Sequence, residues 1–264
     1  MSTVIPTGSP PERPAHKIAS IQVPLKVGEY HGLCPGCGHP VAERVFLEAI
    51  DEAGLAGQAA GTIGHGCYTV INRTADIDWI QTLHGRAPAV ATGIKRVHPD
   101  IAVFSVQGDG DMGMEGLHEI FHAAGRSEHI TSIMLNNGLF GDTGGQMTAS
   151  TVLGQTTKTT REGRNVAEHG YPIPIPELIA QLPGVAYVAR GAVNTPGNIA
   201  QTKKFLRRAI HAQLAGIGFS FVEILTMCPT HWMIPSAQTP DYVGDTFEAT
   251  FPVAELKPLA ASTG

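Results

Sequence analysis

Two short apolar runs, each followed directly by polar loop residues, restrict the fold of this chain more than any other feature. The first run covers residues 101–106 and leads into Gly-Asp-Gly-Asp at residues 108–111, and the second covers residues 130–135 and leads into Asn136-Asn137. Between them, residues 116–125 space their apolar side chains at helical intervals. Strand, glycine-rich turn, helix and strand in this order make a βαβ unit, in which the strands run parallel. The sequence therefore predicts an α/β fold.

Other segments continue the alternation of helices and strands. Residues 39–54 have helical spacing and end in glycine, which predicts an amphipathic helix with a stop signal. Residues 185–189 and 220–225 have the pattern of buried strands, and residues 197–215 between them are predicted to form a helix. The alternation of predicted strands and helices thus continues through most of the chain.

The polar residues that follow the first two apolar runs are expected to lie close together. Parallel strands end at the same edge of a sheet, where ligands of open α/β folds bind, so Asp109 and Asn137 can converge there. A carboxylate and an amide carbonyl are hard oxygen ligands that suit Mg²⁺, which commonly binds phosphate oxygens as well. The glycines permit a close backbone approach and unusual φ angles, and the next helix can direct its N-terminus at phosphates. The pattern predicts a magnesium-diphosphate site, with an ordinary turn as the alternative.

The spacing of these motifs resembles a known signature. A Gly-Asp-Gly segment separated by about 25 residues from an Asn pair is similar to the thiamine-diphosphate-binding domain. The resemblance implies a three-layer α/β fold, with a mostly parallel sheet and helices on both faces. It also implies that the side chains of Asp109 and Asn137 and the carbonyl group of Leu139 bind Mg²⁺.

Two further stretches narrow the resemblance to one family. Thr-Gly-Gly-Gln at residues 143–146 is similar to the thiamine-binding subunit of 2-oxoacid:ferredoxin oxidoreductases, and His-Gly-Arg-Ala at residues 84–87 with Thr-Gly-Ile-Lys at residues 92–95 resembles a stretch that lines their cofactor pocket. From the residues alone, His84 and Arg86 could instead be surface charges at a helix N-terminus. The resemblance assigns cofactor binding to Cys67, Tyr68, His84, Gly85, Gly108, Asp109, Gly110, Asp111, Asn137, Leu139, Gly141 and Thr143.

The four cysteines are a second candidate site. Cys34 and Cys37 form a Cys-Pro-Gly-Cys pair, whereas Cys67 and Cys228 are isolated. A Cys-x-x-Cys pair is typical of half a zinc ribbon or of a redox pair. Nearby histidines could complete a Cys/His zinc site: His31, His39, His65 and His231.

The family resemblance favours a different metal group at these cysteines. In the 2-oxoacid:ferredoxin oxidoreductases, the thiamine subunit can carry one [4Fe-4S] cluster. The similar segments here are the Cys-Pro-Gly-Cys pair, Gly-His-Gly-Cys at residues 64–67 and Cys-Pro-Thr at residues 228–230. The resemblance implies that all four cysteines, Cys34, Cys37, Cys67 and Cys228, ligate the cluster.

Composition bears on partners and on location. Charged residues make up 16% of the chain, against a typical value near 25%, which predicts surface that partner subunits cover. The net charge of −5 and the absence of Lys/Arg clusters argue against nucleic-acid binding. The sequence shows neither a signal peptide nor an apolar run that could cross a membrane, so we expect a cytoplasmic protein.

Residues 1–25, rich in Pro, Ser and Thr, are expected to form a flexible arm. Residues 26–264 are expected to form a single thiamine-diphosphate-binding domain, with the cluster held by its N-terminal, middle and C-terminal segments.

The resemblance implies a subunit that takes part in oxidative decarboxylation of a 2-oxoacid to acyl-CoA and CO₂, with coenzyme A as co-substrate and ferredoxin as electron acceptor. The Cys-Pro-Thr-His-Trp segment at residues 228–232 and the Pro-rich stretch from Tyr171 are more similar to the 2-oxoisovalerate members, or to related aromatic and mixed-specificity members, than to the 2-oxoglutarate members. Thiamine enzymes need a glutamate beside the aminopyrimidine, and because the motifs found here all belong to the diphosphate-binding half, we expect no second domain in this chain to supply it. We therefore expect no catalytic residue from this chain alone, a glutamate from an alpha (pyrimidine-binding) subunit, and gamma or ferredoxin-like subunits as further partners. The alternative is a non-catalytic, zinc-stabilised assembly subunit.

Overall fold

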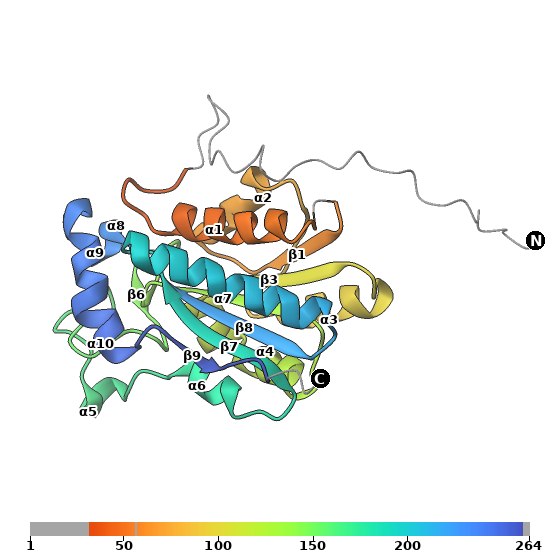
Figure 1. The fold of residues 1–264 in the computed structure, drawn as a ribbon. Helices are drawn as coiled ribbons and strands as arrows, with labels where there is room; N and C mark the ends of the chain where they lie inside the picture. The colour runs from red at the N-terminus through yellow and green to blue at the C-terminus, as the bar shows by residue number, and fades with distance from the viewer. Residues whose placement is uncertain (1–31, 56, 261–264) are drawn as a thin grey trace, which may run out of the picture.

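A computed structural model describes residues 32–55 and 57–260 of the 264-residue chain. Within these residues the main sheet has seven strands in the order β2-β1-β3-β4-β8-β7-β9, and all neighbours pair in parallel except β7 and β9 (Figure 1). A small hairpin, β5 with β6, follows β4. The strand bounds are β1 Ala59–Ile63, β2 Asp78–Gln81, β3 Ala102–Gly108, β4 Thr131–Asn136, β5 Leu139–Phe140, β6 Gln146–Met147, β7 Val185–Ala192, β8 Phe219–Leu225 and β9 Ala254–Lys257.

Helices cover both faces of the sheet, so the fold has three layers (Figure 1). Helices α1 (His39–Glu52) and α7 (Pro196–Leu214) pack on one face, and α3 (Ala87–Val97), α4 (Leu117–Gly125) and α6 (Ile175–Ala180) pack on the other. The remaining helical segments are short: Cys67–Val70, α2 Ile71–Thr74, a π-helical turn Asp111–Glu115, α5 Val166–His169, α8 Pro229–Trp232, Ser236–Gln238, α9 Thr239–Tyr242, a π-helical turn Val243–Phe247 and α10 Glu248–Thr250.

Continuous apolar strands explain why both faces are covered. Along β3, Ala102 and Phe104 join the core under α1 and α7, whereas Val103 between them joins the core under α3 and α4. Successive side chains of a strand point to opposite faces, so an unbroken apolar run needs a helix layer on each side.

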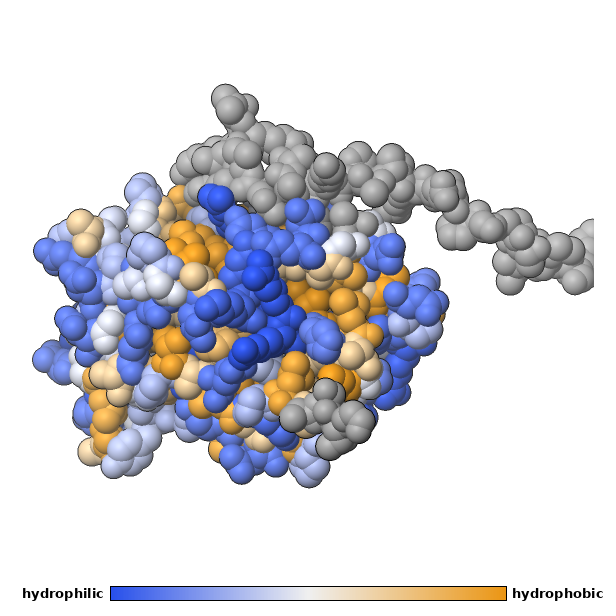
Figure 2. Space-filling view, viewed as in Figure 1, coloured by the Kyte–Doolittle hydropathy of each residue, from blue (hydrophilic) through white to orange (hydrophobic). Residues whose placement is uncertain are grey.

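On the face seen in Figure 2, a hydrophilic band runs between apolar areas over the region where Figure 1 places α1 and helix α7. The cations of α7 pair with α1: the ammonium nitrogen of Lys203 lies 2.8 Å from a carboxylate oxygen of Glu48 and 2.6 Å from one of Glu52. The side-chain oxygen of Thr195 accepts a hydrogen bond from the backbone N–H of Asn198 at 3.1 Å and caps the start of the helix. Helix α7 is thus fixed to the sheet by its buried side and to α1 by ion pairs.

The structure confirms the α/β fold, the parallel βαβ unit and the other helices and strands expected from the sequence. The edge strands β2 and β9 and the short strand β1 were not expected. The arm expected at residues 1–25 lies outside the described residues. No helix within the described residues is both long and apolar enough to span a membrane.

Candidate functional site

The candidate site lies where four neighbouring parallel strands end. Strands β1, β3, β4 and β8 are consecutive in the sheet. The segments that follow them carry Cys67, Asp109, Asn137 and Cys228, respectively. Because parallel strands present their carboxyl ends at one sheet edge, the topology brings both predicted sites together.

A cleft at this edge gathers the residues expected to bind the cofactor. Eleven of the twelve residues line it, and the exception is Gly85. Gly85 nevertheless contacts the site, because its backbone N–H donates to an Asp111 carboxylate oxygen at 2.9 Å. Of the stretches at residues 84–87 and 92–95, only His84 lines the cleft. Residues 92–95 lie within α3. Arg86 forms an ion pair with Glu119 at 2.8 Å, which agrees with the alternative that Arg86 is a surface charge at a helix N-terminus.

Asp109 is a buried carboxylate in the cleft wall, with only 1% of its surface exposed. The Thr148 hydroxyl donates to one of its oxygens, and the backbone N–H of Asn137 donates to the other at 3.4 Å. Burial raises the pKa of Asp109 to about 7, against the lowering effect of these hydrogen bonds. A carboxylate that is buried without a cation is costly, so the site suits a bound metal ion.

The two asparagines after β4 differ in role. The Asn137 side chain lines the cleft and accepts the backbone N–H of Leu139 at 3.2 Å through Oδ1. Asn136 is fully buried, donates to Glu223 at 2.7 Å and accepts the backbone N–H of Gly138 at 2.9 Å. Asn137 is therefore the candidate metal ligand, and Asn136 fixes the loop that carries it.

The glycines of the Gly-Asp-Gly segment permit close approach, but not through unusual backbone angles. Gly110 has φ −70° and ψ −47°, because a helical turn begins at Asp109. A Cβ atom at Gly110 would lie 2.4 Å from the Phe140 ring. The expectation of unusual φ angles was wrong here, and the requirement for glycine comes from packing.

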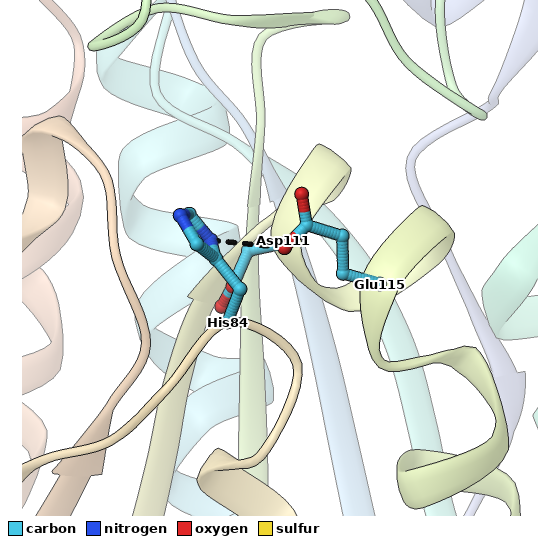
Figure 3. Close-up of side chains that lie close together, drawn as sticks. All are labelled: His84, Asp111 and Glu115. Atoms are coloured by element: carbon cyan, nitrogen blue, oxygen red, sulfur yellow. Dashed lines mark hydrogen bonds and ion pairs between the residues drawn. The ribbon is translucent and has the colours of Figure 1, made fainter.

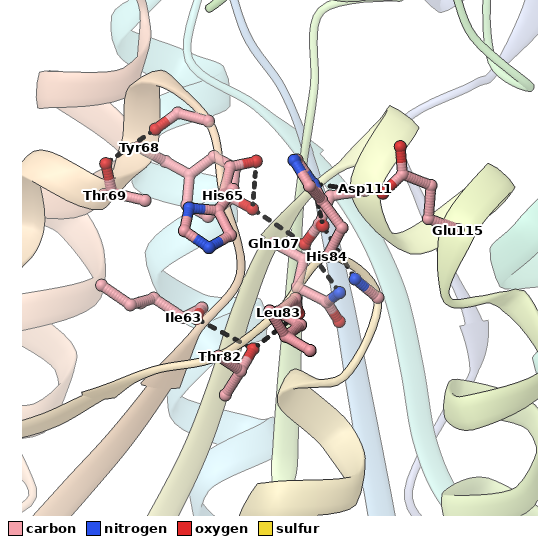
Figure 4. Close-up of polar contacts among 12 residues, drawn as sticks. Ile63, His65, Tyr68, Thr69, Thr82, Leu83, His84, Gln107, Asp111 and Glu115 are labelled. Carbon is pink, nitrogen blue, oxygen red and sulfur yellow. Dashed lines mark hydrogen bonds and ion pairs between the residues drawn. The ribbon is translucent and has the colours of Figure 1, made fainter.

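Asp111 organises the other side of the cleft (Figure 4). Its Oδ2 accepts from the Tyr68 hydroxyl and from Gln107 Nε2, both at 2.8 Å. Its Oδ1 lies 2.9 Å from His84 Nδ1 and accepts the backbone N–H of Gly85. Four protein donors occupy this carboxylate, which makes it a positioning residue for Tyr68 and His84.

Two carboxylates hold the His84 ring in place (Figure 3). Its Nδ1 lies 2.9 Å from Asp111 Oδ1 and 3.2 Å from Glu115 Oε2. Ionised carboxylate oxygens only accept hydrogen bonds, so Nδ1 carries a hydrogen. In the neutral ring, Nε2 is then left as an acceptor at the cleft.

All four cysteines line a second cavity of about 520 Å³, and all are free thiols. The backbone N–H of Cys37 donates to the carbonyl group of Cys34 at 3.1 Å, which closes the Cys-Pro-Gly-Cys turn. The backbone N–H of Gly38 donates to the carbonyl group of Met227 at 3.0 Å and joins this turn to the segment before Cys228. Segments far apart in the sequence therefore converge on one cavity.

Burial dominates the electrostatics of three of these thiols. Burial raises the pKa of Cys37 and of Cys67 to about 12 and that of Cys228 to about 11. Neighbouring cysteines add to the increase, Cys34 and Cys228 in the case of Cys67. Cysteine sulfurs that would repel one another as thiolates form a donor set that suits a cationic iron group.

The cleft and the cavity share a wall. Six residues line both: His39, Gly66, Cys67, Asn137, Gly141 and Asp142. At this wall, a Cβ atom on Gly141 would lie 3.2 Å from the sulfur of Cys67. Trp232 Nε1 also donates to the Asn137 carbonyl group at 3.0 Å, so the segment after Cys228 supports the metal loop.

The sequence predicted some residues of the site only in another role, and others not at all. His39, expected only as a possible zinc ligand, is 3% exposed, and neither ring nitrogen has a hydrogen-bond partner among the described residues. Burial lowers the pKa of His39 to about 4. Its position two residues after Cys37 was a usable signal, as was that of Gln107 directly before the Gly-Asp-Gly segment, whereas nothing in the sequence pointed to Thr148. His65 and His231 each line one of the two hollows, and His31 lies outside the described residues.

Comparisons with known proteins agree with this geometry. Residues 61–224 match the family described as thiamine pyrophosphate enzyme, C-terminal TPP binding domain. The chain is 35% identical over 230 residues to ketoisovalerate oxidoreductase subunit VorA of Methanothermobacter thermautotrophicus, which covers 87% of this chain and 48% of VorA. It is 34% identical over 214 residues to 2-oxoglutarate synthase subunit KorB of Archaeoglobus fulgidus, which covers 81% of this chain and 76% of KorB.

A solved structure supports the same assignment. The 2-oxoglutarate:ferredoxin oxidoreductase from Magnetococcus marinus, with 2-oxoglutarate, coenzyme A and succinyl-CoA bound, matches with a TM-score of 0.75 and 26% identity, over 92% of this chain and 86% of that one. This chain spans about half the length of VorA and three quarters of KorB. By sequence and by structure, the chain belongs to the family of thiamine-diphosphate-binding subunits of 2-oxoacid:ferredoxin oxidoreductases.

Proposed function

We propose that this chain is the subunit that binds thiamine diphosphate, Mg²⁺ and a [4Fe-4S] cluster in an enzyme that converts a 2-oxoacid and coenzyme A to acyl-CoA and CO₂ and reduces ferredoxin. Asp109, Asn137 and the carbonyl group of Leu139 would hold Mg²⁺ in the cleft, and the four cysteines would hold the cluster. When bound, thiamine diphosphate supplies the nucleophilic carbon for the 2-oxo group, and the cluster supplies one-electron transfer.

One observation carries this proposal: the cleft and the cysteine cavity share a wall of six residues. The cleft contains hard oxygen donors for Mg²⁺, and the cavity contains four soft sulfur donors for iron. Two-electron oxidation of the substrate needs an electron acceptor nearby, and a cluster in the cysteine cavity would lie directly beside the cleft. The residues of this wall therefore connect the two halves of the proposed reaction.

This chain's own side chains position the reacting groups. Asp111 fixes the Tyr68 hydroxyl and the His84 ring, and Glu115 adds a second carboxylate at His84 Nδ1. We expect His84 Nε2 to form hydrogen bonds to groups bound in the cleft. The buried Thr148 hydroxyl orients the Asp109 carboxylate toward the proposed metal ion.

The cleft also supports the proposal that a partner completes the site. Its acidic lining residues are the aspartates Asp109, Asp111 and Asp142. The glutamate that we expect at the aminopyrimidine is not among the described residues that line the cleft, so we propose that an alpha subunit supplies it. Gamma or ferredoxin-like subunits and ferredoxin complete the proposed set of partners. The 2-oxoisovalerate type remains our prediction for the substrate.

The spacing of the cysteines counts against the zinc-stabilised assembly subunit. Four thiolates around one zinc ion, at Zn–S distances of about 2.3 Å, would lie about 4 Å apart. Within the described part of the chain, the one group of three or more His, Cys, Asp or Glu ligand atoms mutually within 4.8 Å is His84, Asp111 and Glu115. No three of the cysteine sulfurs are that close together, so the cavity suits a larger group than one ion.

Metal analysis of the anaerobically purified chain tests the cluster. We expect a brown protein with broad absorption near 400 nm and about four iron and four sulfide per chain. A colourless protein with one zinc ion per chain would overturn the cluster proposal. The matched variant Cys67→Ser should lose the cluster absorption, because it removes the thiol at the shared wall.

An activity measurement tests the partner and the substrate. The chain alone is expected to show little or no 2-oxoacid oxidation, and adding its partner subunits should restore coenzyme A-dependent reduction of a viologen. Full activity of the isolated chain would contradict the partner proposal. Testing 2-oxoisovalerate against 2-oxoglutarate in the same assay decides the substrate class, and a preference for 2-oxoglutarate would contradict our prediction.

A further inference from the structure

The strongest unexplained feature of the wall between cleft and cavity is the side chain of His39, the first residue of α1. It is 3% exposed, and both ring nitrogens lack hydrogen-bond partners among residues 32–55 and 57–260. A neutral imidazole has one N–H donor and one acceptor, and leaving them buried and unpaired costs free energy. A buried polar ring in this state suits a group that binds beside it.

The surroundings of His39 indicate which group that is. His39 stands two residues after Cys37, and its backbone lowers the pKa of that thiol against the larger raising effect of burial, so the residue adjoins the cysteine turn. The Tyr68 ring meets the imidazole edge-on, with ring centroids 6.4 Å apart. The Tyr68 hydroxyl donates to Asp111, so it does not satisfy the imidazole. The ring lines both the cleft and the cysteine cavity, and its place two residues after Cys37 favours a partner atom on the cavity side.

We propose that an N–H group of the His39 imidazole donates a hydrogen bond to a sulfur atom of the cluster and raises its reduction potential. This inference rests on the proposed function, because it requires the cluster. A hydrogen bond to sulfur stabilises the added negative charge of the reduced cluster, so the reduced form becomes more favourable. His39 would then set how readily the cluster takes an electron from a substrate in the adjoining cleft. In this proposal His39 acts through the cluster, whose reduction potential it raises, and does not contact the 2-oxoacid.

The test is a redox titration of the cluster in the full chain, followed by electron paramagnetic resonance. His39→Phe keeps a planar ring without a donor, whereas His39→Gln and His39→Asn keep an N–H donor near the positions of Nε2 and Nδ1. His84→Gln is the matched control, because His84 lines the cleft and not the cysteine cavity. Iron content is measured for each protein before titration.

We expect His39→Phe to shift the one-electron reduction equilibrium about tenfold toward the oxidised form, which is ~59 mV. Either His39→Gln or His39→Asn should recover most of the shift, and His84→Gln should leave the potential unchanged. The inference would be overturned by a His39→Phe protein that holds four iron atoms per chain and whose one-electron reduction equilibrium differs less than twofold from that of wild type. A changed affinity for thiamine diphosphate at an unchanged potential would place the bond at the cleft instead, and this too overturns it.

A second measurement does not depend on the variants holding a cluster. In wild type with ring-¹⁵N-histidine, the reduced cluster should show a hyperfine coupling to a ring nitrogen, and His39→Gln should lose it. Absence of any ring-nitrogen coupling in wild type would overturn the inference even if every variant lost its iron. If wild type itself holds no iron, it is the proposed function that fails, so the two failures are distinguishable.

Discussion

Replacing Asp109 by asparagine should make the metal-free protein more stable while removing its ability to bind thiamine diphosphate with Mg²⁺. The amide has nearly the same shape as the carboxylate, and its oxygen can still accept the hydrogen bond from Thr148. The substitution removes the charge and also replaces the oxygen that accepts the backbone N–H of Asn137 at 3.4 Å by an NH₂ group, which offsets part of the gain. In the metal-free protein that charge is buried, with 1% of the side chain exposed.

The magnitude follows from the pKa of this carboxyl group. Burial raises the pKa of Asp109 from an ordinary value near 3.9 to about 7. Between these two pH values the folded protein holds a proton that the unfolded chain has released, so stability falls as pH rises from about 4 to about 7. Above pH 7 the full penalty is present, and a difference of roughly three pKa units corresponds to ~4 kcal/mol as an upper bound.

Thermal or urea unfolding of the full chain, freed of Mg²⁺ and thiamine diphosphate, measures this effect. At pH 8 we expect the free energy of unfolding of Asp109→Asn to exceed that of wild type by ~2–4 kcal/mol. At pH 4 the free energies of unfolding of the two proteins should nearly coincide. Adding Mg²⁺ and thiamine diphosphate should stabilise wild type and not the variant. A variant less stable than wild type at pH 8 would refute the argument from burial. A variant that binds Mg²⁺ and thiamine diphosphate as tightly as wild type would refute the assignment of the ligand.

Three other substitutions test the surroundings of the site. Arg190→Met should lower the free energy of unfolding by ~3–5 kcal/mol, because Glu223 would remain buried without its cation, and a loss below ~1 kcal/mol in urea unfolding would contradict this. Gly64→Ala would place a Cβ atom 1.8 Å from Asp111 Oδ2, so calorimetry should show thiamine diphosphate affinity falling by at least about tenfold, ~1.4 kcal/mol. Tyr68→Phe removes one of four hydrogen bonds to Asp111 and should cost only ~1 kcal/mol in unfolding, with iron content unchanged; loss of the cluster would show a larger role.

The sequence was sufficient for the strands that are long and apolar. Strands β3 and β4 follow from uninterrupted apolar runs, and their order in a βαβ unit implied the shared sheet edge. Strand β1 was missed because residues 59–63, Ala-Ala-Gly-Thr-Ile, are mostly small and lack an apolar pattern. Gly61 in this strand lies against Trp79, and a Cβ atom there would come within 2.1 Å of the indole ring. That contact depends on the pairing of β1 with β2, which the sequence does not reveal.

In the candidate site too, some residues follow from a local sequence pattern and others only from the fold. Asp109 and Asn137 each follow a predicted parallel strand, so the pattern was enough to predict that they lie together. Cys67 and Cys228 are isolated in the sequence, and only the resemblance to a known family joined them to Cys34 and Cys37.

Thr148 acts on the Asp109 carboxylate only because the fold brings it there across 39 residues, and local sequence patterns carry no information on such a contact. Gln107 is different, because it stands directly before the Gly-Asp-Gly segment and donates to Asp111 four residues away. Whether the motif residues bind the expected groups stays a prediction.

The Asn pair is a case in which fold and site depend on each other. Asn136 is the last residue of β4, and its neighbour in the sheet, β8, supplies the buried Glu223. Glu223 in turn pairs with Arg190, its register partner on β7. A row of buried polar contacts across three strands thus ends at Asn136, which holds the backbone of the loop.

Two single substitutions should therefore separate the roles of the two asparagines. Asn136→Ala leaves a Glu223 oxygen and the Gly138 N–H unpaired in the core, so we expect a loss of ~1–3 kcal/mol in unfolding together with weaker thiamine diphosphate binding. Asn137→Ala removes the candidate ligand at the cleft and should abolish Mg²⁺-dependent binding at a smaller cost in stability. Unfolding and calorimetry on both variants distinguish the roles. If Asn137→Ala proved the more destabilising of the two and bound the cofactor normally, the ligand would have to be Asn136, and the orientation of the whole loop would be different.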